Sequence, residues 1–137
     1  MGSGRTSARN MRAVDTNVIV RLATRDDATQ VAVAQAFIAK SGAWVSHVVL
    51  VELAWVLDSV YRFDRKAIAT AIEMLLQQEH VTVQEPEVAA SAVELYRAGK
   101  GRDFADCMIV EVARKAGHLP VGTFDQKLAK VDGAERV

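Results

Sequence analysis

Apolar residues along the chain fall into two patterns, short β-compatible runs and longer stretches with helical spacing. Residues 12–15 form a short run, and a helical pattern follows at once and ends near Asp26. From Ala28 to Gly42, apolar side chains recur at intervals of three and four residues, which is typical of an amphipathic helix. This first part of the chain therefore predicts a strand followed by two helices.

The middle of the chain continues the same alternation. A short strand is expected at 44–46, and residues 48–61 are apolar on nearly every side, which favours a buried helix over a strand because of their length. Asp64 is a candidate N-cap for the next helix, and residues 81–83 are a third strand candidate. Pro86 fits the first turn of a further helix that closes at Gly99.

The last third of the chain predicts one more helix and two more strands. Asp103 caps a helix that ends at Gly117, and strand candidates follow at 119–122 and, as an edge strand, at 136–137, with a short helix at 125–130 between them. Strands separated by one or two helices predict an α/β fold with a parallel sheet that helices cover on both faces.

Composition narrows the class of protein. The 137 residues are 50% hydrophobic and 25% charged, which suits one globular domain. No apolar run reaches the roughly 18 to 20 residues of a membrane span, so we expect a soluble protein without a membrane partner. Cys107 is the single cysteine, which excludes an internal disulfide and fits the reducing cytoplasm. Residues 1–10 are small and polar and precede a second methionine, so we assign them to a cloning remnant or flexible tail and the domain to 11–137.

Charge gives no sign of nucleic-acid binding by itself. The chain has 17 basic and 17 acidic residues, and without Arg5 and Arg9 in the tail 15 basic residues face 17 acidic ones. Any contact with a polyanion would therefore need a local cationic cluster or a metal ion.

Four carboxylates adjoin core-forming residues, whereas the other helical glutamates, Glu111 among them, have an obvious place on a solvated face. The four are Asp15, Glu52, Asp106 and Asp125. Asp15 and Asp125 follow the first and fourth strands, and the other two lie in first turns of helices, so we expect all four at the carboxyl edge of the sheet. An unpaired buried carboxylate costs several kcal/mol, which calls for a shared counter-charge.

The size of the repulsion indicates what that counter-charge is. At separations of about 4 Å and an effective dielectric near 20, each pair of carboxylates repels by about 4 kcal/mol. Either some carboxyl groups are protonated or divalent cations bind, and an all-oxygen site suits Mg²⁺ or Mn²⁺. Local alternatives remain open: Asp15 and Asp103 also fit helix N-caps, and Asp125 also fits a plain turn.

Other reactive residues have simpler interpretations. The histidines His47, His80 and His118 lack metal-ligand spacing, and Cys107 lies among apolar side chains, as a core residue would. Trp44 and Trp55 fit core or subunit contacts. No glycine-rich loop of the dinucleotide or P-loop type is present in the sequence.

Four motifs in order carry a family resemblance: Val14-Asp15-Thr16-Asn17, Val51-Glu52, Phe104-Ala105-Asp106-Cys107 and Gly122-Thr123-Phe124-Asp125. Together they resemble the PIN-domain ribonucleases, and within them the VapC toxins of bacterial toxin-antitoxin pairs. The likeness covers residues 11–137.

The resemblance implies a three-layer α/β/α sandwich around a parallel sheet and hydrolysis of RNA. One or two Mg²⁺ or Mn²⁺ ions would be held by Asp15, Glu52, Asp106 and Asp125, with Asp103 as an additional acidic candidate. Thr16, Asn17 and Thr123 would orient these carboxylates and the metal-bound waters. The ions would activate a water for attack on a phosphodiester.

The same resemblance implies partners. These are a structured RNA such as tRNA or rRNA, a VapB-like antitoxin and a second copy of the chain in a homodimer. Lys100 and Arg102 are candidates for RNA contact, and further cations come from other loops and helix starts: Arg25, Arg62, Arg65, Lys66, Lys127 and Lys130.

Two other classes of function compete with the nuclease. One is a non-catalytic PIN-fold module that binds RNA or protein. The other is a phosphotransfer or phosphatase domain, which also places an Asp after the first strand; the phosphatase needs Asp-x-Asp, and Asp15-Thr16-Asn17 lacks the second Asp.

Overall fold

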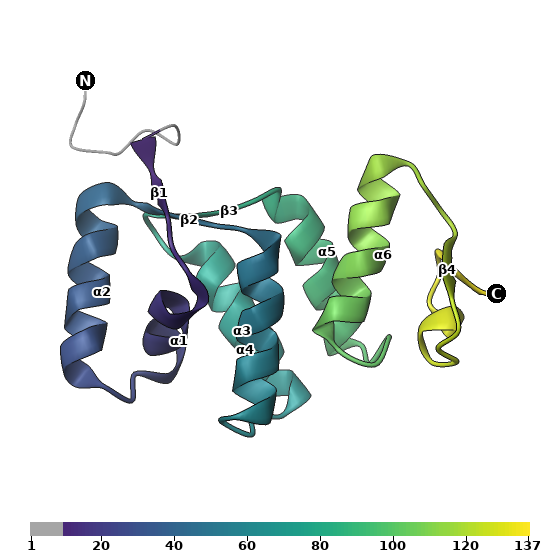
Figure 1. Ribbon diagram of the computed structural model, residues 1–137, viewed down its shortest axis with the longest axis horizontal. Coiled ribbons are helices and arrows are strands. Elements are labelled where there is room, and N and C mark those ends of the chain that lie inside the picture. Colours follow the sequence, from purple (N-terminus) through teal and green to yellow (C-terminus); the bar gives the residue numbers. More distant parts are fainter. Residues whose placement is uncertain (1–9) are drawn as a thin grey trace.

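The computed structural model describes residues 10–137 (Figure 1). The tail expected at 1–10 lies outside the described residues except for Asn10. From Arg12 onward, the order of elements follows the predicted alternation of strands and helices.

The first seven elements confirm the pattern read from the apolar residues. They are β1 (Arg12–Ala13), α1 (Thr16–Thr24), α2 (Ala28–Ser41), β2 (Ala43–Val45), α3 (His47–Ser59), α4 (Arg65–Gln77) and β3 (Val81–Val83). Asp64 caps α4 by accepting a hydrogen bond from the backbone N–H of Ala67, at 2.8 Å. The predicted cap is thus confirmed.

The remaining elements are α5 (Pro86–Arg97), α6 (Phe104–Ala116), β4 (Val121–Thr123), the 3₁₀ turn η2 (Leu128–Lys130) and β5 (Ala134–Arg136). Helix α6 ends at Gly117, whose left-handed backbone (φ 84°) suits glycine. Among residues 10–137, no helix combines the length and the apolar character that crossing a membrane requires.

All strand pairs are parallel, which confirms the α/β class with a central parallel sheet. That sheet has the order β1-β2-β3, with Arg12 opposite Ala43 and Ala43 opposite Val81. The expectation of one continuous sheet needs correction, because β4 and β5 form a separate two-stranded sheet. Figure 1 shows β4 on the side of α6 that faces away from α3, so α6 stands between the two sheets.

The packing explains this division. The main core joins all six helices to the central sheet, and its largest buried side chains include Leu50, Ile72 and Phe104. A second, small core of Val110, Leu128 and Val131 holds the C-terminal segment against the outer side of α6. Helix α6 therefore contributes buried side chains to both cores, Phe104 and Met108 to the main one and Val110 to the small one.

Two expectations about burial were wrong. Helix α3 buries Leu50, Leu53 and Leu57 but exposes its opposite face, where Val48 is 70% and Trp55 65% accessible. Helical spacing places Glu52 on this exposed face, so Glu52 is solvated rather than enclosed. Conversely, Glu111 was expected on a solvated face but is buried, because α5 and the C-terminal segment cover α6. Its Oε1 lies 3.3 Å from Nε of Arg114.

Candidate active site

The first group of candidate residues lies where β1 leads into α1. Asp15 is the N-cap of α1 and accepts a hydrogen bond from the N–H of Val18 at 3.4 Å. The next residue, Thr16, donates its hydroxyl hydrogen to Oε1 of Glu52 on α3, at 2.5 Å. Thr16 thus ties the N-terminus of α1 to the side chain of Glu52. Asp15, Asn17 and Glu52 are exposed.

The second group lies at the N-terminus of α6. Asp103 caps this helix by accepting the N–H of Asp106 at 3.0 Å, which confirms its role as a cap. Oδ2 of Asp106 accepts the backbone N–H of Arg102 at 2.7 Å. Asp106 is 9% exposed and is the buried member of the four candidate carboxylates, and these backbone bonds fix its orientation.

Asp125 reaches the same end of α6 from the loop after β4. Its Oδ1 accepts the N–H of Leu128 at 2.8 Å, and its own N–H donates to Oγ1 of Thr123 at 3.0 Å. Oδ2 lies 3.4 Å from Nε of Arg102. The Leu128 N–H, followed by the charge of Arg102, lowers the pKa of Asp125 below its usual value. Asp125 is therefore ionised at neutral pH.

The four carboxylates form two pairs in place of the single cluster that the sequence predicted. Asp15 and Glu52 are linked through Thr16, whereas Asp106 and Asp125 are linked through Arg102. Helix α3, which carries Glu52, packs against both α1 and α6.

Within residues 10–137, no three His, Cys, Asp or Glu side chains lie close enough together to hold a metal ion. The expectation that all four carboxylates are buried together is corrected, because β1 and the exposed face of α3 leave Asp15 and Glu52 in solvent. The all-oxygen donors still match the preference of Mg²⁺ and Mn²⁺, and the assignment of these residues as ligands stays a prediction.

Arg65 has a role that the sequence did not reveal. It donates hydrogen bonds to carbonyl oxygens near the end of α5 and in the loop before α6, namely those of Tyr96, Lys100, Gly101 and Arg102, at 3.1 to 3.5 Å. Its guanidinium also stacks on the ring of Tyr96. No local pattern announces such a role, since the partners lie more than thirty residues away along the chain.

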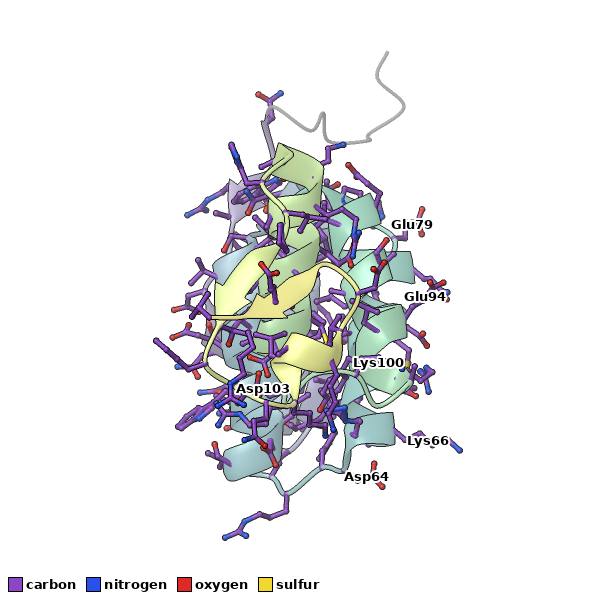
Figure 2. The ribbon with its side chains drawn as sticks, turned by 90° about the vertical axis from the view of Figure 1, so that its right-hand side faces the viewer. Asp64, Lys66, Glu79, Glu94, Lys100 and Asp103 are labelled. Atoms are coloured by element: carbon purple, nitrogen blue, oxygen red, sulfur yellow. The ribbon has the colours of Figure 1, made fainter. Side chains whose placement is uncertain are left out.

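Cationic candidates for RNA contact lie on this same loop. Lys100 and Arg102 are both exposed, and Arg102 is held beside Asp125. Figure 2 shows Lys100 and Asp103 toward the end of the molecule that carries Asp64 and Lys66, with Glu79 and Glu94 toward the other end. The loop before α6 thus presents charges of both signs.

Cys107 behaves as the core residue that was expected. It is 1% exposed, its Sγ donates to the carbonyl of Lys100 at 3.3 Å, and burial raises its pKa to about 12. The thiolate is thus essentially absent at neutral pH, which excludes Cys107 as a nucleophile.

A large cavity is lined mainly by apolar residues and by none of the four candidate carboxylates. It measures about 680 Å³ and opens between α1, α2 and α4. Its walls include Leu22, Ile38, Phe63, Ala71 and Met74, and charged residues of both signs, Arg25, Asp64, Lys66 and Glu79, also line it.

Comparisons with known proteins agree with this fold. The family model described as "PIN domain" matches residues 12–134, so the chain belongs to the PIN domain family. The chain is similar to a protein named VapC ribonuclease from Aquifex aeolicus, with 26% identity over 125 residues that cover 88% of this chain and 92% of the relative.

A solved structure also matches. It is the crystal structure of VapC20 of Mycobacterium tuberculosis, described as a Sarcin-Ricin loop cleaving toxin. The match has a TM-score of 0.41 and 21% identity, and it covers 86% of this chain and 92% of that one.

Proposed function

We propose that this protein is an endoribonuclease that depends on Mg²⁺ or Mn²⁺ and acts as the toxin of a toxin-antitoxin pair. The observation that carries the proposal is the presence of two carboxylate pairs in a PIN-domain chain, with Asp15 and Asp106 at the starts of α1 and α6. Its similarity to a protein named VapC ribonuclease supports the choice of RNA as substrate.

In this proposal Asp15, Glu52, Asp106 and Asp125 hold one or two divalent ions. Thr16 positions Glu52 and Thr123 positions Asp125 through the hydrogen bonds described above, and Asn17 follows Thr16 in the chain. The ion supplies Lewis-acid activation of water and phosphate when it is bound. Asp106 contributes a carboxylate that the backbone N–H of Arg102 already holds in place.

The test compares two helix-capping aspartates. Asp15 caps α1 and Asp27 caps α2, and asparagine caps helices as well as aspartate does. We therefore expect Asp15→Asn to fold normally and to lose RNA cleavage by at least a hundredfold, whereas Asp27→Asn keeps it. The measurement is cleavage of total bacterial RNA, read by sequencing new 5′ ends, with Mn²⁺ and with EDTA.

The outcome decides between enzyme and binding module. Ends that appear with wild type and Asp27→Asn, and vanish with Asp15→Asn or EDTA, support the nuclease and identify its target. Equal cleavage by the two variants contradicts the proposed role of Asp15. We expect the ends to lie in tRNA or rRNA.

A second candidate function has one observation in its favour. No three acidic side chains of residues 10–137 are gathered for a metal ion, which favours a PIN-fold module that binds RNA or protein without cutting it. Binding of RNA by wild type without any cleavage in Mn²⁺ would support this alternative.

The proposed partner is a VapB-like antitoxin, and the cavity between α1, α2 and α4 offers a surface for it. An amphipathic helix of a partner could place large apolar side chains against Leu22, Phe63 and Met74, with its own charges at the charged positions beside them. The proposed occupant is therefore a helical segment of the antitoxin.

A homodimer is proposed from the exposed apolar residues on α3 and α6. Val48 and Trp55 on α3, and Ile109 and Val112 on α6, are 40% to 70% accessible. Burial of such residues against a second copy would remove apolar surface from water. We place the protein in the cytoplasm, where its RNA substrates occur.

A further inference from the structure

Arg102 contacts the carboxylates of Asp106 and Asp125 through different parts of the residue. Its backbone N–H donates to Oδ2 of Asp106 at 2.7 Å, and its guanidinium Nε lies 3.4 Å from Oδ2 of Asp125. The side chain can therefore be replaced without loss of the bond to Asp106. The guanidinium of Arg102 places a positive charge beside Asp125, one of the four carboxylates assigned to a divalent ion.

The backbone around Arg102 is held firmly while its side chain stays accessible. Arg65 donates to the carbonyl oxygens of Gly101 and Arg102, at 3.3 and 3.1 Å, and Cys107 donates to that of Lys100. The side chain of Arg102 is 69% exposed, against 25% for that of Asp125. The guanidinium can thus leave Asp125 by side-chain rotation alone, and the backbone of the loop need not move.

We propose that Arg102 is a displaceable counter-ion: it pairs with Asp125, competes with a divalent cation for that carboxylate, and on release contacts a phosphate of the RNA backbone. The inference rests on the proposed function. A guanidinium and a divalent cation beside one carboxylate repel each other, so the cation must displace the arginine. Once released, the planar guanidinium matches the geometry of a phosphate group.

The first experiment measures Mn²⁺ affinity by isothermal titration calorimetry without RNA. We expect Arg102→Met to bind Mn²⁺ about three- to tenfold more tightly than wild type, because a competing charge is gone. Arg102→Lys keeps the charge and should stay close to wild type. The matched control is Arg97→Met, which removes an arginine paired with Glu73 on a surface formed by α4 and α5. Equal affinities for wild type and Arg102→Met overturn the inference.

The second experiment measures binding of RNA by fluorescence anisotropy, with Asp15→Asn present in every variant to prevent cleavage. Addition of Arg102→Met should weaken binding of a single-stranded RNA by about three- to tenfold and reduce the salt slope by about one. Arg97→Met should change neither quantity. Unchanged RNA affinity in the Arg102→Met variant overturns the phosphate contact.

The two proposals fail in different ways. If no variant binds Mn²⁺ and wild type cuts no RNA, the nuclease function is wrong, and the role of Arg102 falls with it. If wild type cuts RNA in Mn²⁺ but Arg102→Met binds the ion no more tightly, the role of Arg102 alone is wrong.

Discussion

The guanidinium of Arg65 lies over the ring of Tyr96, 4.3 Å from its centroid, and also donates to the carbonyl oxygen of Tyr96 at 3.2 Å. The contact joins the start of α4 to the end of α5. The other hydrogen bonds of the same guanidinium reach the loop that leads to Asp106. One side chain thus connects the helical core to the backbone that positions a candidate catalytic carboxylate.

Replacement of Arg65 by methionine should destabilise the fold. The variant loses charge-assisted hydrogen bonds and a cation–π contact, and we expect the free energy of unfolding to fall by about 2 kcal/mol. Urea denaturation measures the change. The control is Lys66→Met, an exposed neighbour on the same helix. Equal denaturation midpoints for the two variants would show that the loop does not need Arg65.

Gly101→Ala should disturb Asp106 specifically. Gly101 has a left-handed backbone (φ +68°), and an added Cβ would lie 3.1 Å from Cβ of Asp106. Gly99 has a similar backbone (φ +81°), but a Cβ there meets no atom of the described residues within 4 Å. Both alanine variants carry backbone strain, so the difference between their stabilities reports the effect of the contact with Asp106.

We expect Gly101→Ala to be less stable than Gly99→Ala by about 1 kcal/mol and to cleave RNA more slowly. Thermal unfolding and the cleavage assay measure these effects. Similar cleavage by the two variants would mean that a shift of Asp106 is harmless.

The cluster around Asp26 predicts how stability depends on pH. Asp26 accepts hydrogen bonds from Tyr61, Arg21 and Thr24, which lower its pKa from 3.8 to about 2. Because the folded-state pKa is lowered, the ionised group stabilises the fold above about pH 4 and loses this contribution as the pH falls toward 2.

The measurement compares the unfolding of wild type and Asp26→Asn across this range. Wild type should be the more stable of the two near neutral pH, and the difference should shrink between pH 4 and pH 2. Asp58→Asn, an exposed site on α3, serves as the control. A difference that stays constant down to pH 2 would contradict the role assigned to Asp26.

Two exposed apolar residues should separate the two proposed protein interfaces. Trp55 on α3 and Met74 on α4 are each 65% accessible, so a glutamate at either position leaves the core intact. We expect Trp55→Glu to weaken the homodimer by roughly tenfold or more and to leave antitoxin binding unchanged. Met74→Glu should have the opposite pattern. Sedimentation velocity and calorimetry with the antitoxin measure the two effects, and a variant that impairs both would argue against separate surfaces.

Much of the local structure could be predicted from the sequence. Asp64 and Asp103 each cap a helix by accepting a hydrogen bond from the backbone N–H three residues later. A short stretch of sequence is therefore enough to recognise such a cap. The apolar spacing that predicted α2 is equally local. Burial of Cys107 followed from its apolar neighbours in the chain.

The relations between distant residues were decided by the tertiary structure alone. Apolar residues surround Glu52 in the sequence, yet it is exposed, because only one side of α3 faces the core. Strands β4 and β5 are separate from the central sheet because α6 packs between the two sheets. The bonds from Arg65 to the loop before α6 and the pairing of Arg102 with Asp125 join segments that are distant in the chain. Spacing along the sequence shows which residues lie on the same face of one helix. Which faces of different helices pack against each other is decided only when the chain folds.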